Sequence, residues 1–339
     1  MANNVLATDS VQQKSRELRI TFGLRGLLIF LLAATYALVL VSLPLLAFRD
    51  RVSYIELYAP YSDLILQHHA RKGFLPLMAN EPAWLLLNIA LSSVLRPEDV
   101  VRVIIFVPAF MVAWMTLRSK PQHIFWLFLI LLYPAIVKNH ITHLRQGVAI
   151  AIFLIGVLAT RHRGLRWLLI GMTPFIHSSF FFVIGIMFLA HLSRRMRFAA
   201  DLSILCFVLA TAAITLSLEW SVSALGARQA AEMQLLDRTQ VSGVGFVFWG
   251  VMLGIMTIEG KDYLRRHRFE VATIIFYLGT YFFTPITARV FESALLLILI
   301  AGVELTRWRG LVFKSAIVAF GIVTWITGYA LNVMVNSLS

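Results

Sequence analysis

The sequence predicts an all-α polytopic membrane protein, and two observations carry this prediction. Of its 339 residues, 59 % are hydrophobic and only 14 % are charged. The charged residues fall almost entirely between apolar runs, and runs such as 24–48 and 312–335 exceed the roughly 18 to 20 residues that cross a bilayer. We therefore expect a bundle of about nine to eleven transmembrane helices, with re-entrant or interfacial helices beside them.

Composition restricts the domain organisation and the partners. No polar stretch is long enough to bury a second core, so we expect a cytoplasmic basic leader at 1–25 and one bundle over 26–339. The net charge of +13 comes from short basic segments beside apolar runs, which indicates membrane topology and not nucleic-acid binding. The single cysteine, Cys206, excludes an intramolecular disulfide and a cysteine-based metal site.

The positive-inside rule predicts the threading of the chain. It places the leader in the cytoplasm, followed by an uncleaved first span and an outside loop at about 49–81. The basic segments assigned to the cytoplasm are 118–120, 161–166, 194–197, 261–268 and 307–314. The predicted spans after the loop are 100–117, 124–137, 147–159, 199–218, 241–258, 271–283, 287–305 and 312–335, with the C-terminus outside.

Two apolar runs do not fit a simple crossing. The run 82–95 has only about 14 residues, so it is predicted to be an interfacial or re-entrant helix. The run 165–192 is basic at both ends, so it is predicted to dip towards the outside and return. Pro174 supplies the break, because proline removes a backbone donor and disrupts the preceding turn.

This threading brings the polar residues with the strongest case for function to the outside face. Arg145 opens an apolar helix, where its charge adds to the positive end of the helix dipole and predicts an anion site. Arg289 follows a Thr284-Pro285 interruption and has a similar setting. An interfacial anchor is the alternative for Arg145, and an ion pair with Glu292 is the alternative for Arg289.

His177 lies beside the predicted helix break, so it needs a hydrogen-bond partner or a catalytic task. A core histidine satisfied by Ser178 or Ser179 is the other interpretation. A zinc site built from His140, His143 and His177 is disfavoured, because no recognised metal-ligand spacing accompanies them. No nucleophile elbow, phosphate-binding glycine loop or dinucleotide fingerprint occurs.

Several of these segments occur in an order that resembles the EpsG family of exopolysaccharide-synthesis membrane proteins, which are related in role to the Wzy polymerases. The resemblance covers roughly residues 50 to 300. Its motifs are Tyr61 and Asp63 in the first outside loop, Glu81-Pro82, Arg145-Gln146-Gly147-Val148-Ala149, Ile176-His177-Ser178-Ser179 and Ala288-Arg289. Arg145 and Gly156 also match an Arg-x10-Gly spacing described for some Wzy polymerases. The chain departs from the family in having Ala83-Trp84 after Glu81-Pro82.

The resemblance implies an enzyme that joins oligosaccharide units carried on a polyprenyl diphosphate. It would act at the outer face of the bacterial cytoplasmic membrane, with a GT-C-like bundle as one arrangement and no soluble cofactor or metal. A flippase and a chain-length regulator are the implied partners beside membrane lipid. The residues assigned to this reaction are Arg145 and Arg289 for the diphosphate, Tyr61, His143 and Gln146 for sugar, and Asp63, Glu81 or His177 as general base.

Two other functions suit the same residues. A transporter or flippase of lipid-linked saccharide would bind the same polyanion, although the internal repeats common in transporters are not detected. An integral membrane acyltransferase also combines histidines and arginines with about ten spans, but it would be expected to place a carboxylate or histidine dyad on the cytoplasmic side.

Overall fold

The computed structural model describes residues 23–48, 50–224, 242–284, 286–328, 331 and 334. Most of the basic leader, Pro285 and the C-terminal residues therefore lie outside the described residues. In chain order the described elements are the first helix Gly23–Ser42, η1 Leu45–Ala47, α2 Arg51–Ser53, η2 Tyr54–Tyr58, α3 Ala59–Arg71, α4 Phe74–Ala79, α5 Pro82–Ser92, α6 Pro97–Ser119, η3 Pro121–His123, α7 Ile124–Leu131, α8 Pro134–Ile141, α9 Leu144–Leu154, η4 Ile155–Ala159, α10 Arg163–Met172, η5 Thr173–Phe175, α11 Phe180–Arg195, α12 Ala200–Ala224, α14 Val244–Ile258, α15 Lys261–Arg266, α16 Arg268–Thr280, α17 Ile286–Val303 and α18 Arg307–Ile326.

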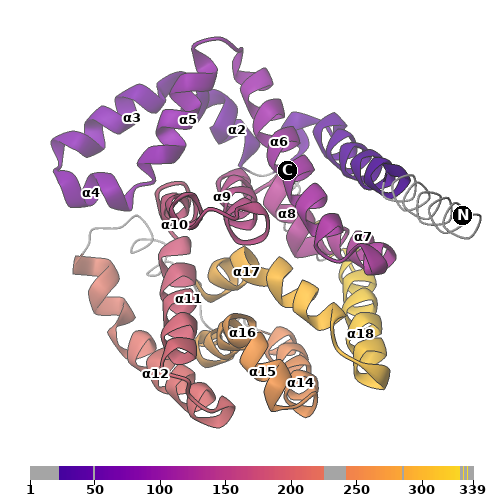
Figure 1. The fold of residues 1–339 in the computed structure, drawn as a ribbon. Coiled ribbons are helices and arrows are strands. Elements are labelled where there is room, and N and C mark those ends of the chain that lie inside the picture. The colour runs from indigo at the N-terminus through magenta and orange to yellow at the C-terminus, as the bar shows by residue number, and fades with distance from the viewer. Residues whose placement is uncertain are drawn as a thin grey trace, which may run out of the picture.

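The described part of the chain is helical throughout, as an all-α membrane protein requires (Figure 1). Four helices are long and apolar enough to cross a membrane: Gly23–Ser42, Pro97–Ser119, Ile286–Val303 and Arg307–Ile326. A bent pair, Pro121–Leu131 with Pro134–Ile141, makes a fifth if it is one span. This is fewer than the nine to eleven expected, because other apolar runs form shorter helices, among them Leu144–Ala159, Val244–Ile258 and Arg268–Thr280.

Proline accounts for the bend in the run 124–137, which we expected to be one span. The axis turns by 69° between α7 and α8. Tyr133, which precedes Pro134, has the extended backbone angle ψ of 132°, the conformation that a following proline favours. The predicted crossing at 124–137 is therefore a bent pair of helices, which forms either one broken span or a re-entrant loop.

The segment predicted as the long outside loop is also folded. Residues 51–79 form α2, η2, α3 and α4, and α3 packs along α5. Figure 1 shows these helices together at one end of the molecule. The short apolar helix α5 has 11 residues, about 16 Å at 1.5 Å per residue, which is too short to cross a bilayer. This length agrees with the predicted interfacial or re-entrant helix.

The break predicted at Pro174 is present. Helix α10 ends at Met172, the 3-10 turn η5 holds Pro174, and α11 begins at Phe180. The rings of Trp167 in α10 and His191 in α11 lie 6.3 Å apart, whereas a continuous helix would separate these residues by about 36 Å. The chain therefore folds back at this break, as the sequence indicates.

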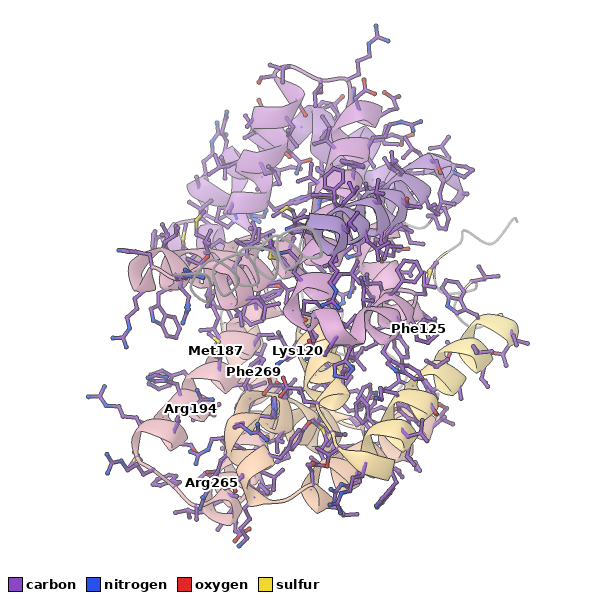
Figure 2. The ribbon with its side chains drawn as sticks, turned by 45° about the vertical axis from the view of Figure 1, so that its right-hand side comes forward. Lys120, Phe125, Met187, Arg194, Arg265 and Phe269 are labelled. Atoms are coloured by element: carbon purple, nitrogen blue, oxygen red, sulfur yellow. The ribbon has the colours of Figure 1, made fainter. Side chains whose placement is uncertain are left out.

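Three of the basic segments assigned to the cytoplasmic side, 118–120, 194–197 and 261–268, are connected through polar contacts. Lys120 at the end of α6 pairs with Glu304 after α17 at 2.7 Å, and His267 Nε2 lies 3.4 Å from the same carboxylate. Arg194 donates to the carbonyl of Arg266, and Figure 2 shows Arg194 and Arg265 pointing outwards in this region. Segments that the positive-inside rule puts on one side are thus neighbours in the fold.

Helix α17 is the central helix of the bundle. It is the most buried of the four candidate spans, with 83 % of its apolar window buried, and it packs against α6, α7, α8, α9, α11, α16 and α18. Gly302 lets α18 approach, because a Cβ at this position would overlap the Phe313 ring. The close packing of α17 against α18 therefore depends on the absence of a side chain at Gly302, near the C-terminal end of α17.

We predict that Gly302→Ala destabilises the protein by about 1 to 3 kcal/mol, the usual cost of overpacking a filled core. Gly254→Ala in α14 is the matched control, because a Cβ there meets no atom within 4 Å and alanine favours a helix. Thermal unfolding in detergent measures both. An unchanged melting temperature for Gly302→Ala would contradict the close contact between α17 and α18.

Candidate functional site

Glu81 stands at the start of α5 in a conformation that is unusual for its residue type. Its backbone is left-handed, with φ 59° and ψ 53°, and the residue is 5 % exposed. A non-glycine residue in this region costs of order 1 to 3 kcal/mol and persists where its surroundings enforce it. The surroundings of the Glu81 carboxylate explain why the conformation is kept.

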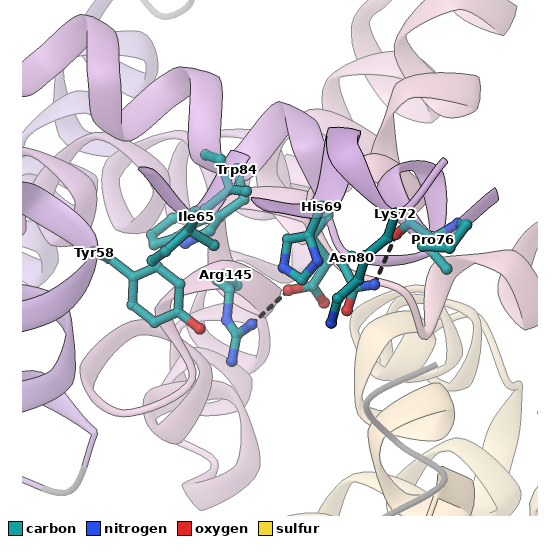
Figure 3. A pocket seen from close by; sticks show the side chains of 11 residues that line it. Tyr58, Ile65, His69, Lys72, Pro76, Asn80, Trp84 and Arg145 are labelled. Atoms are coloured by element: carbon teal, nitrogen blue, oxygen red, sulfur yellow. Dashed lines mark hydrogen bonds and ion pairs between the residues drawn. The ribbon is translucent and has the colours of Figure 1, made fainter. Parts of the chain in front are cut away.

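Three residues from two segments donate to this carboxylate. Arg145 Nη1 from α9 lies 2.5 Å from Oε2. His177 Nδ1 lies 3.1 Å from Oε1, and the Ser178 backbone N–H donates to the same oxygen at 3.1 Å. Figure 3 draws the contact between Arg145 and this carboxylate. Glu81 therefore joins α5, the first turn of α9 and the link between η5 and α11.

These donors keep the carboxyl group ionised. Burial on its own would raise the pKa of Glu81, but the charge of Arg145, the contacts with His177 and the Ser178 N–H outweigh it. The net result is a pKa held below the usual value of a glutamate. Glu81 is therefore a fixed negative charge at neutral pH.

Local packing explains why Arg145 reaches this position. The chain leaves the helical conformation at Thr142 and His143 between α8 and α9, so Arg145 falls in the first turn of α9. A Cβ on Gly147 would overlap the Asn139 carbonyl, so glycine allows the two helices to pack closely. The Arg145 guanidinium also lies over the Tyr58 ring, 5.3 Å from its centroid.

His177 offers a second nitrogen beyond the one that Glu81 holds. An ionised carboxylate only accepts hydrogen bonds, so Nδ1 carries the proton and Nε2 carries the lone pair. Nε2 is buried and makes no hydrogen bond to any described residue. The pair therefore has the arrangement in which a carboxylate orients an imidazole for proton transfer.

A second group of hydrogen bonds, made by the chain neighbours of Arg145 and Ser178, reaches the central helix. Ser179 Oγ lies 2.9 Å from Ser293 Oγ in α17, and Gln146 Nε2 donates to Ser293 Oγ at 3.1 Å and to the Arg289 carbonyl at 2.9 Å. Glu292, one residue before Ser293, pairs with Lys138 of α8 at 2.6 Å. One polar network thus links α5, α8, α9, α11 and α17 inside an apolar bundle.

Several atoms of this network have unused hydrogen-bonding capacity. We call the side chains of His143, Gln146, His177 and Glu292 the inner polar cluster. His143 Nδ1, Gln146 Oε1, His177 Nε2 and Glu292 Oε2 are all buried and lack a hydrogen-bond partner among the described residues. Buried polar atoms are normally satisfied by protein, water or ligand, so these four atoms are the ones that water or a ligand hydroxyl would satisfy.

A cavity of about 410 Å³ is lined in part by the Glu81 and Arg145 pair. Its walls come from η2, α3, α4, α5 and α9 (Figure 3). The polar lining residues are Tyr58, His69, Lys72, Asn80, Glu81 and Arg145, and the remainder are Ile65, Pro76, Ala79, Trp84 and Leu85. Two cationic side chains beside aromatic and aliphatic walls suit a ligand that is anionic at one end and apolar at the other.

The structure brings most of the predicted site residues together, but not all of them. Glu81, Arg145, Gln146 and His177 belong to the network, and His143 immediately precedes α9, two residues before Arg145. Asp63 and Tyr61 lie exposed on α3 and do not line the cavity. Their predicted roles therefore gain no geometric support.

The sequence suggested an ion pair between Arg289 and Glu292 as an alternative, but Glu292 has another partner. Glu292 forms its ion pair with Lys138 of α8, while the Arg289 carbonyl accepts from Gln146 and its side chain is half-buried. Sequence reasoning did not select Lys138, Ser293, Lys72 or Trp84 as site residues. Ser293 follows Arg289 by four residues, a spacing that places both on one helix face and could have indicated it.

No group of three His, Cys, Asp or Glu side chains with metal-binding geometry occurs among the described residues. His140 is buried with its ring edge against Tyr36. Comparison of the chain with family models, curated proteins and solved structures finds no match. The network and the cavity are therefore the features that bear on function.

We predict that Glu81→Gln and Arg145→Gln each cost about 3 to 5 kcal/mol of stability, because each leaves a buried charge without its partner. The exposed pair Lys261 and Asp201 provides the matched control, and Asp201→Asn should cost less than about 1 kcal/mol. Chemical unfolding in detergent compares the three variants. Equal effects at the two pairs would refute the buried contact.

The lowered pKa of Glu81 predicts a pH dependence. Because the pKa is lower in the folded than in the unfolded protein, the ionised carboxylate stabilises the fold above about pH 4.3, the ordinary value. This contribution is lost as the pH falls through the folded-state pKa. The melting-temperature difference between the native chain and Glu81→Gln should thus stay constant from pH 7 to 5 and shrink below. A difference that vanishes by pH 6 would mean a raised pKa.

Proposed function

We propose that the protein is a glycosyltransferase that joins lipid-linked oligosaccharide units by transferring a growing chain from polyprenyl diphosphate to an acceptor sugar hydroxyl. The observation that carries this proposal is the Glu81 carboxylate, which binds Arg145 on the cavity side and His177 on the side of the inner polar cluster. An anion-binding group and a proton acceptor are thereby held within one network.

The cavity has the groups that a departing diphosphate needs. Negative charge develops on the diphosphate as the glycosidic bond breaks, and fixed cations stabilise that charge. Lys72 and Arg145 line the cavity, and arginine matches phosphate oxygens well. The apolar lining residues Ile65, Pro76 and Leu85 would pack against the first part of the polyprenyl chain.

Geometry favours His177 among the three candidate bases. Asp63 is exposed on α3, away from the cavity lining. Glu81 is held by Arg145 and has a lowered pKa, which makes it a weak base. His177 Nε2 carries an unused lone pair, and its ring is oriented by Glu81.

In the proposed reaction the acceptor hydroxyl oxygen attacks the anomeric carbon of the donor. The bond from that carbon to the diphosphate oxygen breaks as the new glycosidic bond forms. His177 Nε2 takes the hydroxyl proton, Glu81 stabilises the resulting imidazolium, and Arg145 with Lys72 holds the departing polyprenyl diphosphate. His143 and Gln146 would bind acceptor hydroxyls with the unused atoms of the inner polar cluster.

The order of motifs that resembles the EpsG family supports the same reaction. The residues of three of its motifs, Glu81-Pro82, Arg145-Gln146 and His177-Ser178-Ser179, meet in the network. With the predicted threading, this site faces the outside of a bacterial cytoplasmic membrane and the N-terminus is cytoplasmic. A flippase would deliver the substrate, and a chain-length regulator would act on the product.

The test is incubation of the purified protein in lipid with a polyprenyl-diphosphate-linked oligosaccharide, scored by the length ladder of the product. We expect a ladder for the native chain and a loss of roughly 10²- to 10⁴-fold in rate for His177→Ala, the range for removal of a general base. His191→Ala is the matched control, because His191 lies exposed near the other end of α11.

Other outcomes would change the proposal. A ladder that survives His177→Ala but is lost in Asp63→Asn would move the base to α3. Absence of any ladder, with movement of labelled lipid between leaflets, would indicate a flippase. Transfer of an acyl group to polysaccharide without extension would indicate an acyltransferase.

A further inference from the structure

Large apolar side chains are exposed in the middle of α3 and at the start of α4. Leu64 is 56 % exposed, Phe74 is 72 % and Leu75 is 63 %. The chain turns between the two helices at Gly73, whose φ of 112° is one that side chains other than glycine rarely adopt. We call residues 64–79 the α3–α4 tip. Figure 1 shows it at the periphery of the molecule.

The tip is also basic. Arg71 and Lys72 are adjacent and exposed, His68 and His69 precede them in the last turn of α3, and residues 64–80 include no acidic side chain. Cations at the C-terminal end of a helix are favoured by its dipole. Positive charge and apolar surface therefore lie next to each other in the sequence and in space.

Packing among the described residues leaves this surface exposed. Helix α4 packs against α3 and α5, and Phe74 and Leu75 remain exposed. Apolar side chains beside lysine and arginine are the pattern of segments that lie in the membrane interface. There the apolar groups enter the acyl region, while the basic groups reach the phosphates of anionic headgroups.

We propose that the α3–α4 tip docks onto the surface of an anionic phospholipid bilayer, with Phe74 and Leu75 inserted and Arg71 and Lys72 at the headgroup phosphates. Lys72 and Pro76 belong both to the tip and to the lining of the cavity. Docking would therefore hold the cavity at the level of the headgroups. The proposal concerns the lipid surface and stands independently of the proposed reaction.

The experiment uses the full chain with Cys206→Ser, labelled with an environment-sensitive fluorophore at Leu75→Cys or, as the matched position, at Asp63→Cys. Both residues are exposed and lie in the helices between the first span and α5. In nanodiscs that contain phosphatidylglycerol, a quencher carried on lipid should reduce the fluorescence at position 75 several-fold more than at position 63. Aqueous iodide should show the reverse order.

The charge requirement is tested with Arg71→Gln and Lys72→Gln at the same label position. Each change should weaken the preference of the tip for phosphatidylglycerol over phosphatidylcholine by roughly fivefold. The control is Lys261→Gln with Arg265→Gln in α15, a basic pair far from α4 in Figure 1, which should leave quenching at position 75 unchanged.

Lipid quenching at position 75 that is no stronger than at position 63 would overturn the proposal, because the tip would then lie no deeper in the bilayer than the exposed face of α3. Insertion that is indifferent to phosphatidylglycerol would overturn its electrostatic part. Neither measurement involves saccharide or turnover, so failure of the proposed reaction would leave these results unaffected.

Discussion

The ion pair between Glu81 and Arg145 is the interaction on which the polar interior depends. A guanidinium at the start of an apolar helix adds to the positive end of the helix dipole, and burial makes that arrangement more costly. The Glu81 carboxylate offsets this charge at 2.5 Å and leaves one oxygen for His177 and Ser178. Without Glu81, neither the position of Arg145 nor the orientation of His177 would be fixed.

The pair also contacts two different environments. Glu81 and Arg145 line the cavity, with Lys72 and apolar walls, and Glu81 also holds His177, which belongs to the inner polar cluster and does not line the cavity. A reaction that separates a lipid-bound anion from a sugar needs both kinds of surface close together. The left-handed backbone of Glu81 is strained, and the contacts of its carboxylate with both Arg145 and His177 hold the residue in this conformation.

Local features of the fold could be predicted from the sequence, because they depend on neighbouring residues. Pro174 indicated the break between α10 and α11, and the length of the run after Glu81 indicated a helix too short to cross. Pro134 carried a comparable signal, since the residue before a proline avoids the helical conformation, but the apolar composition around it concealed the bend. The helices of residues 51–79 were missed because their apolar side chains are interspersed with charges.

The site was predictable as a set of residues but not as a set of partners. Glu81, Arg145 and His177 stood out because charged and polar groups are costly in an apolar bundle. Their convergence depends on contacts across 64 and 96 residues of chain, which no local pattern encodes. The same limit explains why the partner of Glu292 was not predicted. Its neighbour Arg289, three residues away, was considered, but the actual partner is Lys138, which is 154 residues away in the sequence.

The central claim is that Glu81, and not the carboxylate of Asp63, holds Arg145. Double-mutant cycles in detergent test it most directly, with Arg145→Gln combined in turn with Glu81→Gln and with Asp63→Asn. The structure predicts a coupling free energy of about 2 to 3 kcal/mol between Glu81 and Arg145, and one within about 0.5 kcal/mol of zero between Asp63 and Arg145. Coupling that is absent for Glu81, or larger for Asp63, would contradict the arrangement of the site.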